Sequence, residues 1–260
     1  MATPAPATPA PAPPGLDTVL GKTLAILQSF TVERTTLAFT ELQKSTGLPK
    51  ATLHRVVGDL QAARLLEKVG NRYRLSRLVF ELGMRASVER SLIEVATPYL
   101  EDLYERTHET VHLGVREDVE VVYVVKMGGH QQAAAPSRLG GRMPLHATAV
   151  GKALLAHAPD DVRDQVLGMP LLRRSPRTIT SAEVLRQQLA EVVERGVAFE
   201  YEESAVGIVC VAAPVLDAED KVVAAISVTG PITRFRPAQH ASAVHAAAAG
   251  IAATLARRRT

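Results

Sequence analysis

The sequence predicts an α+β protein with two domains, a small basic one followed by a larger near-neutral one. Its 260 residues allow one or two hydrophobic cores at roughly 100 to 200 residues per domain. Residues 1–90 contain 12 Lys and Arg against 7 Asp and Glu, whereas residues 91–260 contain 18 against 20. The strand-like runs 207–216 and 222–229 are joined by a short turn, so they must pair antiparallel. The uneven charge indicates a polyanionic partner for the first domain alone.

Composition excludes several other classes of protein. No run reaches the roughly 18 consecutive apolar residues that a membrane-spanning helix needs. The first residues lack the basic and apolar regions of a signal peptide, and the single cysteine, Cys210, cannot form an internal disulfide. These features predict a cytoplasmic protein with no membrane partner.

The chain begins with a segment that has nothing to bury. Residues 1–15 are rich in proline and carry no charge, so we expect a disordered tail. From Asp17 to Phe30, apolar residues recur at spacings near three and four, which predicts the first helix. The ordered part of the first domain should therefore start near residue 16.

Two further helices with a sharp turn between them are expected next. The second should begin at Thr40, with Gln43 completing a Thr-x-x-Gln capping box, and end at Gly47, which readily adopts a left-handed conformation. Pro49 suits the first turn of the third helix, because its missing N–H would have no partner there. Four apolar residues at i, i+3, i+4 and i+7 give this third helix one buried face: Leu53, Val56, Val57 and Leu60.

A short hairpin completes the first domain. Two extended runs within residues 66–75 surround the turn pair Gly70-Asn71 and predict a β-hairpin. Three helices followed by a hairpin indicate a winged helix-turn-helix over residues 16–76. A helical pattern over residues 77–91 predicts a linker helix, which leaves residues 92–260 for the second domain.

The winged helix-turn-helix suggests which residues would contact DNA. A recognition helix fits the major groove and reaches base edges with the exposed side chains near its N-terminus. In the third helix these side chains are Lys50, Thr52, His54 and Arg55, and in the hairpin Arg72 and Arg74 share one face. Arg55 has the geometry to bind a guanine or a phosphate through two hydrogen bonds. The alternative is an ordinary amphipathic helix with a solvated basic face.

The segment His108-Glu109-Thr110-Val111-His112 raises a different hypothesis. It matches H-E-x-x-H, which on a helix places two imidazoles to bind zinc, with the Glu as general base. The β-branched residues beside His112 instead favour a strand, in which residues four apart stand roughly 13 Å from each other. A zinc-dependent hydrolase stays the alternative function. We assign no catalytic residue, metal ligand or cofactor.

The second domain mixes strands with helices. Strands are expected at Val111–Val115, Val119–Met127, Gly207–Leu216 and Val222–Thr229, and helices at Thr148–His157, Ala182–Glu194 and Pro237–Arg257. Glu200 precedes the third strand, and the hydroxyl groups of Ser227 and Thr229 alternate along the fourth. A few polar groups among apolar ones would suit a small polar ligand, and a satisfied sheet interior is the equally open alternative. Cys210, between two valines, is expected to be a buried hydrophobe rather than a nucleophile.

Three passages together resemble the IclR family of bacterial transcriptional regulators: residues 46–55, 144–156 and 207–215. The resemblance extends from about Leu20 to Leu255. It implies an N-terminal winged helix-turn-helix, a linker helix and a C-terminal effector-binding domain of PAS/GAF-like shape. It also implies a homodimer or homotetramer that binds double-stranded operator DNA. The predicted function is thus a regulator, expected to be a repressor, of a catabolic operon controlled by a small organic or aromatic acid.

The same resemblance assigns an effector site. Ala149 and Val150 match a loop that lines the effector pocket, and Ile208 and Cys210 match its strand wall. Ser227 and Thr229 match residues that hold an effector carboxylate, and Glu200 matches a position often occupied by Asp. The chain departs from the family pattern at Ala51, where Ser or Thr commonly touches a phosphate, and in the Ala149-Val150 pair, which is bulkier than the Gly-containing versions.

Overall fold

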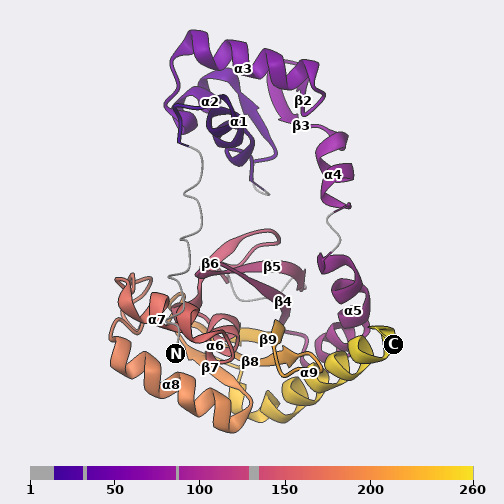
Figure 1. The fold of residues 1–260 in the computed structure, drawn as a ribbon, viewed down its shortest axis with the longest axis vertical. Helices are drawn as coiled ribbons and strands as arrows, with labels where there is room; N and C mark the ends of the chain where they lie inside the picture. Colours follow the sequence, from indigo (N-terminus) through magenta and orange to yellow (C-terminus); the bar gives the residue numbers. More distant parts are fainter. Residues whose placement is uncertain (1–14, 32–33, 86–87, 129–134, 260) are drawn as a thin grey trace, which may run out of the picture. The chain divides into compact units, whose positions relative to one another are not determined.

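The computed structural model describes residues 15–31, 34–85, 88–128 and 135–259. The chain separates into two compact units, Met1–Ala86 and Ser87–Thr260 (Figure 1). Nearly all of the predicted tail, residues 1–14, lies outside the described residues. The finer division into tail, DNA-binding domain, linker helix and effector-binding domain stays a prediction. Within the described ranges, no helix is long and apolar enough to cross a membrane.

The N-terminal unit is a winged helix-turn-helix, as the sequence predicts. Its helices and strands are α1 (Val19–Gln28), β1 (Thr36–Ala38), α2 (Phe39–Thr46), α3 (Lys50–Ala62), β2 (Leu66–Val69) and β3 (Arg72–Leu75). The hairpin turns at Gly70, which has a φ of +60°. The three strands pair antiparallel in the order β1-β3-β2. Strand β1 was not predicted, since three residues are too few for a recognisable alternation.

The predicted cap of α2 is wrong, because this helix begins at Phe39 rather than after Thr40. The carboxylate of Glu41 reaches back and accepts a hydrogen bond from the N–H of Ala38 at 2.7 Å. The predicted end is confirmed, since Gly47 follows the helix with a φ of +68°. The ends of α2 therefore set a sharp turn into α3.

A compact core holds α3 in place. All four apolar residues predicted to face inward from α3 are buried, each 3% exposed or less. Burial of one such side chain stabilises the fold by about 1.5–3 kcal/mol, so the core fixes which face of α3 meets solvent. The residues that form this core are Ile26, Leu37, Leu42, Leu48, Leu53, Val56, Val57, Leu60 and Leu66.

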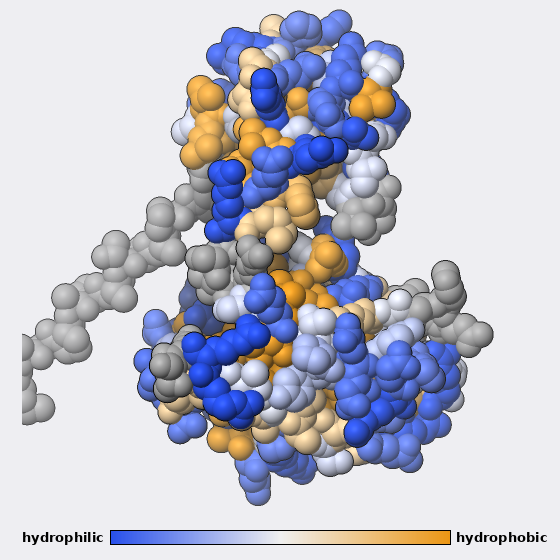
Figure 2. Space-filling model, turned by 90° about the vertical axis from the view of Figure 1, so that its right-hand side faces the viewer, coloured by the Kyte–Doolittle hydropathy of each residue, from blue (hydrophilic) through white to orange (hydrophobic). Residues whose placement is uncertain are grey.

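Two helices of this unit expose large apolar side chains. The predicted apolar stripe of α1 is only partly buried, because Val19 and Leu20 are 60% and 59% exposed. The expected linker helix is shorter than predicted: α4 covers Arg77–Gly83, and Phe80 on it is 68% exposed. Figure 2 shows a surface that is largely hydrophilic in this view, with hydrophobic residues at intervals. Apolar side chains as exposed as these favour contact with another surface.

The C-terminal unit is built on one antiparallel sheet. Its strands are β4 (Thr110–Glu117), β5 (Glu120–Met127), β6 (Arg142–Pro144), β7 (Ala198–Tyr201), β8 (Ile208–Leu216) and β9 (Val222–Pro231), in the order β6-β5-β4-β9-β8-β7. Its helices are α5 (Val88–Thr107), the 3₁₀ turn Leu145–Ala147, α6 (Ala149–Ala156), α7 (Asp160–Gly168), α8 (Ala182–Arg195) and α9 (Pro237–Arg259). All four strands and three helices predicted after residue 107 are present. The short strands β6 and β7 and the polar helix α7 escaped prediction.

Helices cover both faces of this sheet (Figure 1). One apolar core lies between the sheet and helices α5 and α9, and a second lies on the face covered by α6 and α8. Strand alternation sends Val209 and Val211 into the first core and Cys210 and Ala212 into the second. The result is the α+β, PAS/GAF-like domain that the sequence predicts.

Candidate functional site

The outer face of α3 carries the side chains predicted to contact DNA. Lys50, His54 and Arg55 are exposed, and Thr52 is half-buried. In the described part of the chain, no hydrogen bond or ion pair occupies the side-chain nitrogens of Lys50 or Arg55. Their charges are free to meet phosphates or base edges.

The two arginines predicted in the wing share an exposed face of β3, but each has an acidic partner. Arg72 Nη2 lies 2.7 Å from Glu41 Oε2 and donates to the carbonyl oxygen of Thr36 at 2.9 Å. Arg74 pairs with Glu67. Ion pairs this exposed stabilise a fold by no more than about 1 kcal/mol, so a phosphate can replace either carboxylate.

A polar cavity lies in the C-terminal unit between the sheet and the start of α6. Its volume is about 20 Å³, which holds about one water molecule. Val150 lines the cavity. It also packs closely on β4, because a Cβ added to Gly114 would fall 2.7 Å from the Val150 Cγ1 atom. The hydroxyl of Thr148 caps α6 by accepting a hydrogen bond from the N–H of Gly151 at 2.9 Å.

Most residues predicted to bind an effector meet at this cavity. The register of the sheet pairs Glu200 with Cys210 and Cys210 with Thr229, so these three side chains point to the same face. Ser227 is fully buried and is not in the cavity lining, although its hydroxyl contacts His112 Nδ1. That these residues bind an effector stays a prediction. The predicted residues that line the cavity are Ala149, Val150, Glu200, Ile208, Cys210 and Thr229.

His112 is a cavity residue that the effector prediction missed. Its Nε2 atom lies 2.8 Å from the Ser137 hydroxyl and its Nδ1 atom 3.2 Å from the Ser227 hydroxyl. Burial, together with the charge of Lys126, lowers the pKa of His112 to about 3. The ring is therefore neutral and presents one donor and one acceptor. A polar residue between two buried apolar ones, Val111 and Leu113, was the available signal.

The other missed lining residues come from separate parts of the chain. No sequence pattern around these residues indicates a binding site, since only the folded sheet and its loops bring them together. They are Tyr123, Ala135, Pro136, Ser137, Met143, Thr148 and Ser204.

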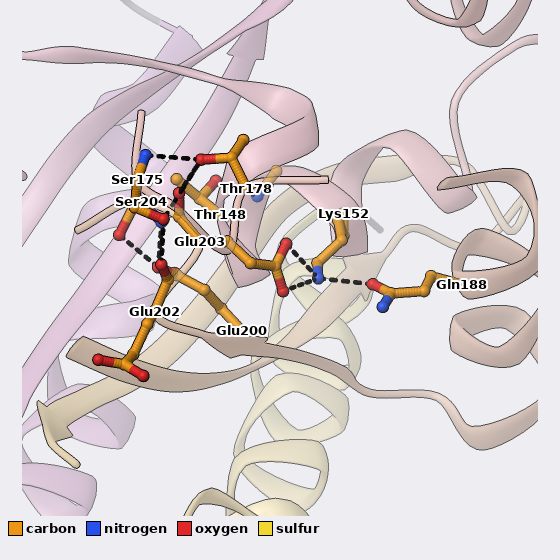
Figure 3. A network of polar contacts seen from close by, with 10 residues as sticks. Thr148, Lys152, Ser175, Thr178, Gln188, Glu200, Glu202, Glu203 and Ser204 are labelled. Atoms are coloured by element: carbon orange, nitrogen blue, oxygen red, sulfur yellow. Dashed lines mark hydrogen bonds and ion pairs between the residues drawn. The ribbon is translucent and has the colours of Figure 1, made fainter. Parts of the chain in front are cut away.

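Glu200 is the acidic residue among the side chains lining the cavity. It is 3% exposed and accepts hydrogen bonds from the Ser204 hydroxyl and from the Ser204 N–H, the latter at 2.9 Å (Figure 3). Burial raises its pKa to about 7, against the opposing hydrogen bonds from Ser204. Burial also raises the pKa of the Cys210 thiol to about 12, so this thiol is a poor nucleophile. The expectation that Cys210 is a buried hydrophobe agrees with its 3% exposure.

The segment His108-Glu109-Thr110-Val111-His112 does not form a helical zinc motif. Helix α5 ends at Thr107, His108 has a φ of +51°, and His112 lies within β4. Glu109 instead forms a bidentate ion pair with Arg234, at 2.7 and 2.9 Å. Among the described residues, no group of three or more His, Cys, Asp or Glu side chains is placed to hold a metal ion. The geometry that a zinc-dependent hydrolase needs is therefore absent from this segment.

A helix-turn-helix with free cations on its third helix, in one chain with a domain that contains a polar cavity, defines a DNA-binding regulator with an effector-binding domain. Residues 84–253 match the family described as bacterial transcriptional regulator IclR C-terminal, and residues 19–70 match the IclR helix-turn-helix domain. The chain belongs to the IclR family.

Individual relatives agree with this assignment. The HTH-type transcriptional regulator KdgR of Escherichia coli is 34% identical over 249 residues, which cover 94% of this chain and 94% of KdgR. XynR, another HTH-type regulator of Escherichia coli, is 35% identical over 224 residues, covering 85% of this chain and 89% of XynR. A crystal structure of an IclR homolog complexed with 4-hydroxybenzoate, from Microbacterium hydrocarbonoxydans, superposes with a TM-score of 0.85 at 31% identity, over 93% of this chain and 100% of that one.

Proposed function

We propose that this protein is a cytoplasmic repressor of a catabolic operon, released from its operator by a small organic acid. The observation that carries the proposal is a cavity lined by hydroxyl, imidazole and carboxyl groups. The same chain has a recognition helix, α3, with unpaired cations. The Escherichia coli relative named transcriptional repressor IclR, 31% identical over 221 residues, supports repression. The 4-hydroxybenzoate complex of the Microbacterium homolog supports an acid as the effector.

The cavity suggests how an acid would bind. The Thr229 hydroxyl, which donates to Cys210 Sγ at 3.0 Å, and the His112 imidazole, whose nitrogens contact the Ser137 and Ser227 hydroxyls, are donors that would turn to an effector. Glu200 supplies an acceptor. A carboxylate would be held by the donors, while a hydroxyl group on the same effector would face Glu200. The small volume favours a compact acid or requires Val150 to move.

The winged helix-turn-helix units of two copies would act as a pair. Exposed apolar side chains on α1 and α4, such as Val19, Leu20 and Phe80, suit an interface with a second copy of the chain. A two-fold dimer recognises inverted half-sites at a spacing set by its geometry. An effector that binds one arrangement of the pair more tightly than another would shift their populations and so change operator affinity, without any chemical reaction.

Footprinting on the DNA upstream of this protein's own gene tests the proposal. We expect a protected palindrome, and Arg55→Ala should weaken binding to it by about 1–3 kcal/mol if this guanidinium contacts a base. Arg106→Ala is the matched control, because Arg106 is an exposed arginine on α5 whose partner is Asp102. Unchanged specific binding by the Arg55→Ala protein would remove Arg55 from the recognition surface. Absence of any protected palindrome would count against the proposal as a whole.

A further inference from the structure

Lys152 is a fully buried charged residue that the DNA and effector contacts do not use. It is 1% exposed, and its Nζ atom lies 2.7 and 2.9 Å from the two carboxylate oxygens of Glu203 (Figure 3). The Oε1 atom of Gln188 on α8 accepts a third hydrogen bond from the same Nζ at 2.7 Å. All three ammonium donors are therefore satisfied.

A pair this deeply buried is not explained by stability. Removing two charges from water costs free energy that their attraction recovers only when the geometry is good, and apolar residues of the same size often stabilise a fold as well or better. Buried ion pairs are best attested as devices that select one arrangement of the elements they join.

Lys152 and Glu203 join two walls of the cavity. Lys152 lies one turn into α6, whose first residues, Ala149 and Val150, line the cavity on one side. Glu203 lies in the loop between β7 and β8 and directly precedes Ser204, which also lines the cavity. The ion pair thus ties the start of α6 to the loop that carries Ser204.

The same loop is held on its outer side by two hydroxyl groups. Thr178 Oγ1 donates to the carbonyl oxygen of Glu203 at 2.7 Å, and the Ser175 hydroxyl donates to the carbonyl oxygen of Glu202 (Figure 3). These contacts fix the backbone so that Glu203 faces away from the cavity and Ser204 faces Glu200.

We propose that Lys152 and Glu203 are a positioning pair, which holds α6 and the β7–β8 loop at the separation that gives the cavity its size and its selectivity for an effector. The role of the cavity as an effector pocket rests on the proposed function, whereas access to the cavity can be measured without an effector. With the pair broken, α6 and the loop separate locally, and small molecules reach the Cys210 side chain in the cavity lining more readily than in the intact protein.

Cys210 gives a direct readout of cavity access, because it is the single cysteine of the chain and lies in the cavity lining. The full-length protein is treated with methyl methanethiosulfonate under native conditions, and the rate of Cys210 modification is followed by mass spectrometry. Lys152→Met and Glu203→Gln should each raise this rate by about tenfold or more, through local opening. Arg195→Met is the matched control, since it breaks an exposed ion pair with Glu191 on α8, and it should leave the rate unchanged.

A double variant separates positioning from stability. Replacing Lys152 with Met and Glu203 with Leu fills the site with apolar groups, which should restore much of the stability that either single variant loses. The proposal expects Cys210 to stay accessible in the double variant, because no directed bond then joins the two walls. Modification of the double variant at the wild-type rate would show that the pair only fills space and would overturn the proposal.

The dependence on urea identifies the kind of opening. Local opening exposes little surface, so the modification rate should be nearly flat at low urea, whereas global unfolding gives a steep rise. A steep rise in the single variants, or wild-type rates in both, would also overturn the proposal. Because the readout uses no effector and no DNA, failure here is distinct from failure of the proposed repressor function, which footprinting tests.

Discussion

The carboxyl group of Glu200 should make the stability of the C-terminal unit depend on pH. Burial raises the pKa of this group from 4.5 to about 7, while hydrogen bonds from Ser204 and the charge of Lys152 oppose the rise and the charge of Glu203 adds to it. The titratable groups around it also include Tyr123 on β5 and Cys210 on β8. Burial raises the pKa of both, so they stay protonated at neutral pH.

The magnitude follows from the difference in pKa between the folded and unfolded chain. A carboxyl group whose pKa is higher in the folded protein binds more protons when folded, so the free energy of unfolding falls as pH rises through this interval. From 4.5 to about 7, the loss at neutral pH and above is roughly 3 kcal/mol. Glu200→Gln keeps the shape and one acceptor for Ser204 but cannot ionise. The variant should therefore lack this loss.

Urea unfolding of both proteins, followed by circular dichroism between about pH 5 and about pH 8, measures the effect. The wild-type protein should lose stability relative to Glu200→Gln as pH rises, with most of the change below about pH 7 and little above it. Transitions of the two units are analysed separately, and only that of the C-terminal unit should differ. Parallel stability curves for the two proteins across this range would refute the assignment of Glu200 as a buried, titrating acid.

Two further predictions concern the cavity and the wing. Val150→Ala should cost roughly 1–3 kcal/mol in urea unfolding and enlarge the cavity. In thermal-shift assays with a set of small organic acids the variant should respond more strongly than the wild type, and an equal response would show that Val150 does not limit the cavity. Glu67→Gln should free Arg74, so binding to random duplex DNA should strengthen and the slope of log affinity against log salt should steepen by about one unit. Glu105→Gln on α5 is the control for net charge, and an equal gain there would mean that the wing does not contact phosphate.

The recognition helix α3 could be predicted because the residues that define it are close together in the sequence. Gly47 and Pro49 define the turn before α3, and the spacing of Leu53, Val56 and Leu60 defines its buried face. In contrast, β1, β6 and β7 have only three or four residues each, too few for alternation to be visible. The start of α2 depends on which side chain accepts a hydrogen bond from the free backbone N–H groups. That side chain is Glu41, rather than the Thr40 and Gln43 of the predicted capping box.

The candidate pocket was only partly predictable from residues. Glu200, Cys210 and Thr229 meet because β7, β8 and β9 are neighbours in one register, which strand periodicity alone does not specify. His112 and Tyr123 come from the next strands of the same sheet, and no local pattern connects them to Glu200. Nor does the sequence around Lys152 show that its charge is buried, since that depends on Glu203, which is 51 residues away.

The most direct test of the central claim is the operator affinity of the full-length protein with and without an acid that binds the C-terminal unit. The acid is selected by thermal shift from small organic acids, and affinity for the footprinted operator is measured by fluorescence anisotropy at fixed salt. An effector that binds one arrangement of the paired winged helix-turn-helix units more tightly must change this affinity by thermodynamic linkage. The change is typically about 5- to 150-fold. We expect weaker operator binding in the presence of the acid. Operator affinity that is unchanged by saturating acid would contradict it.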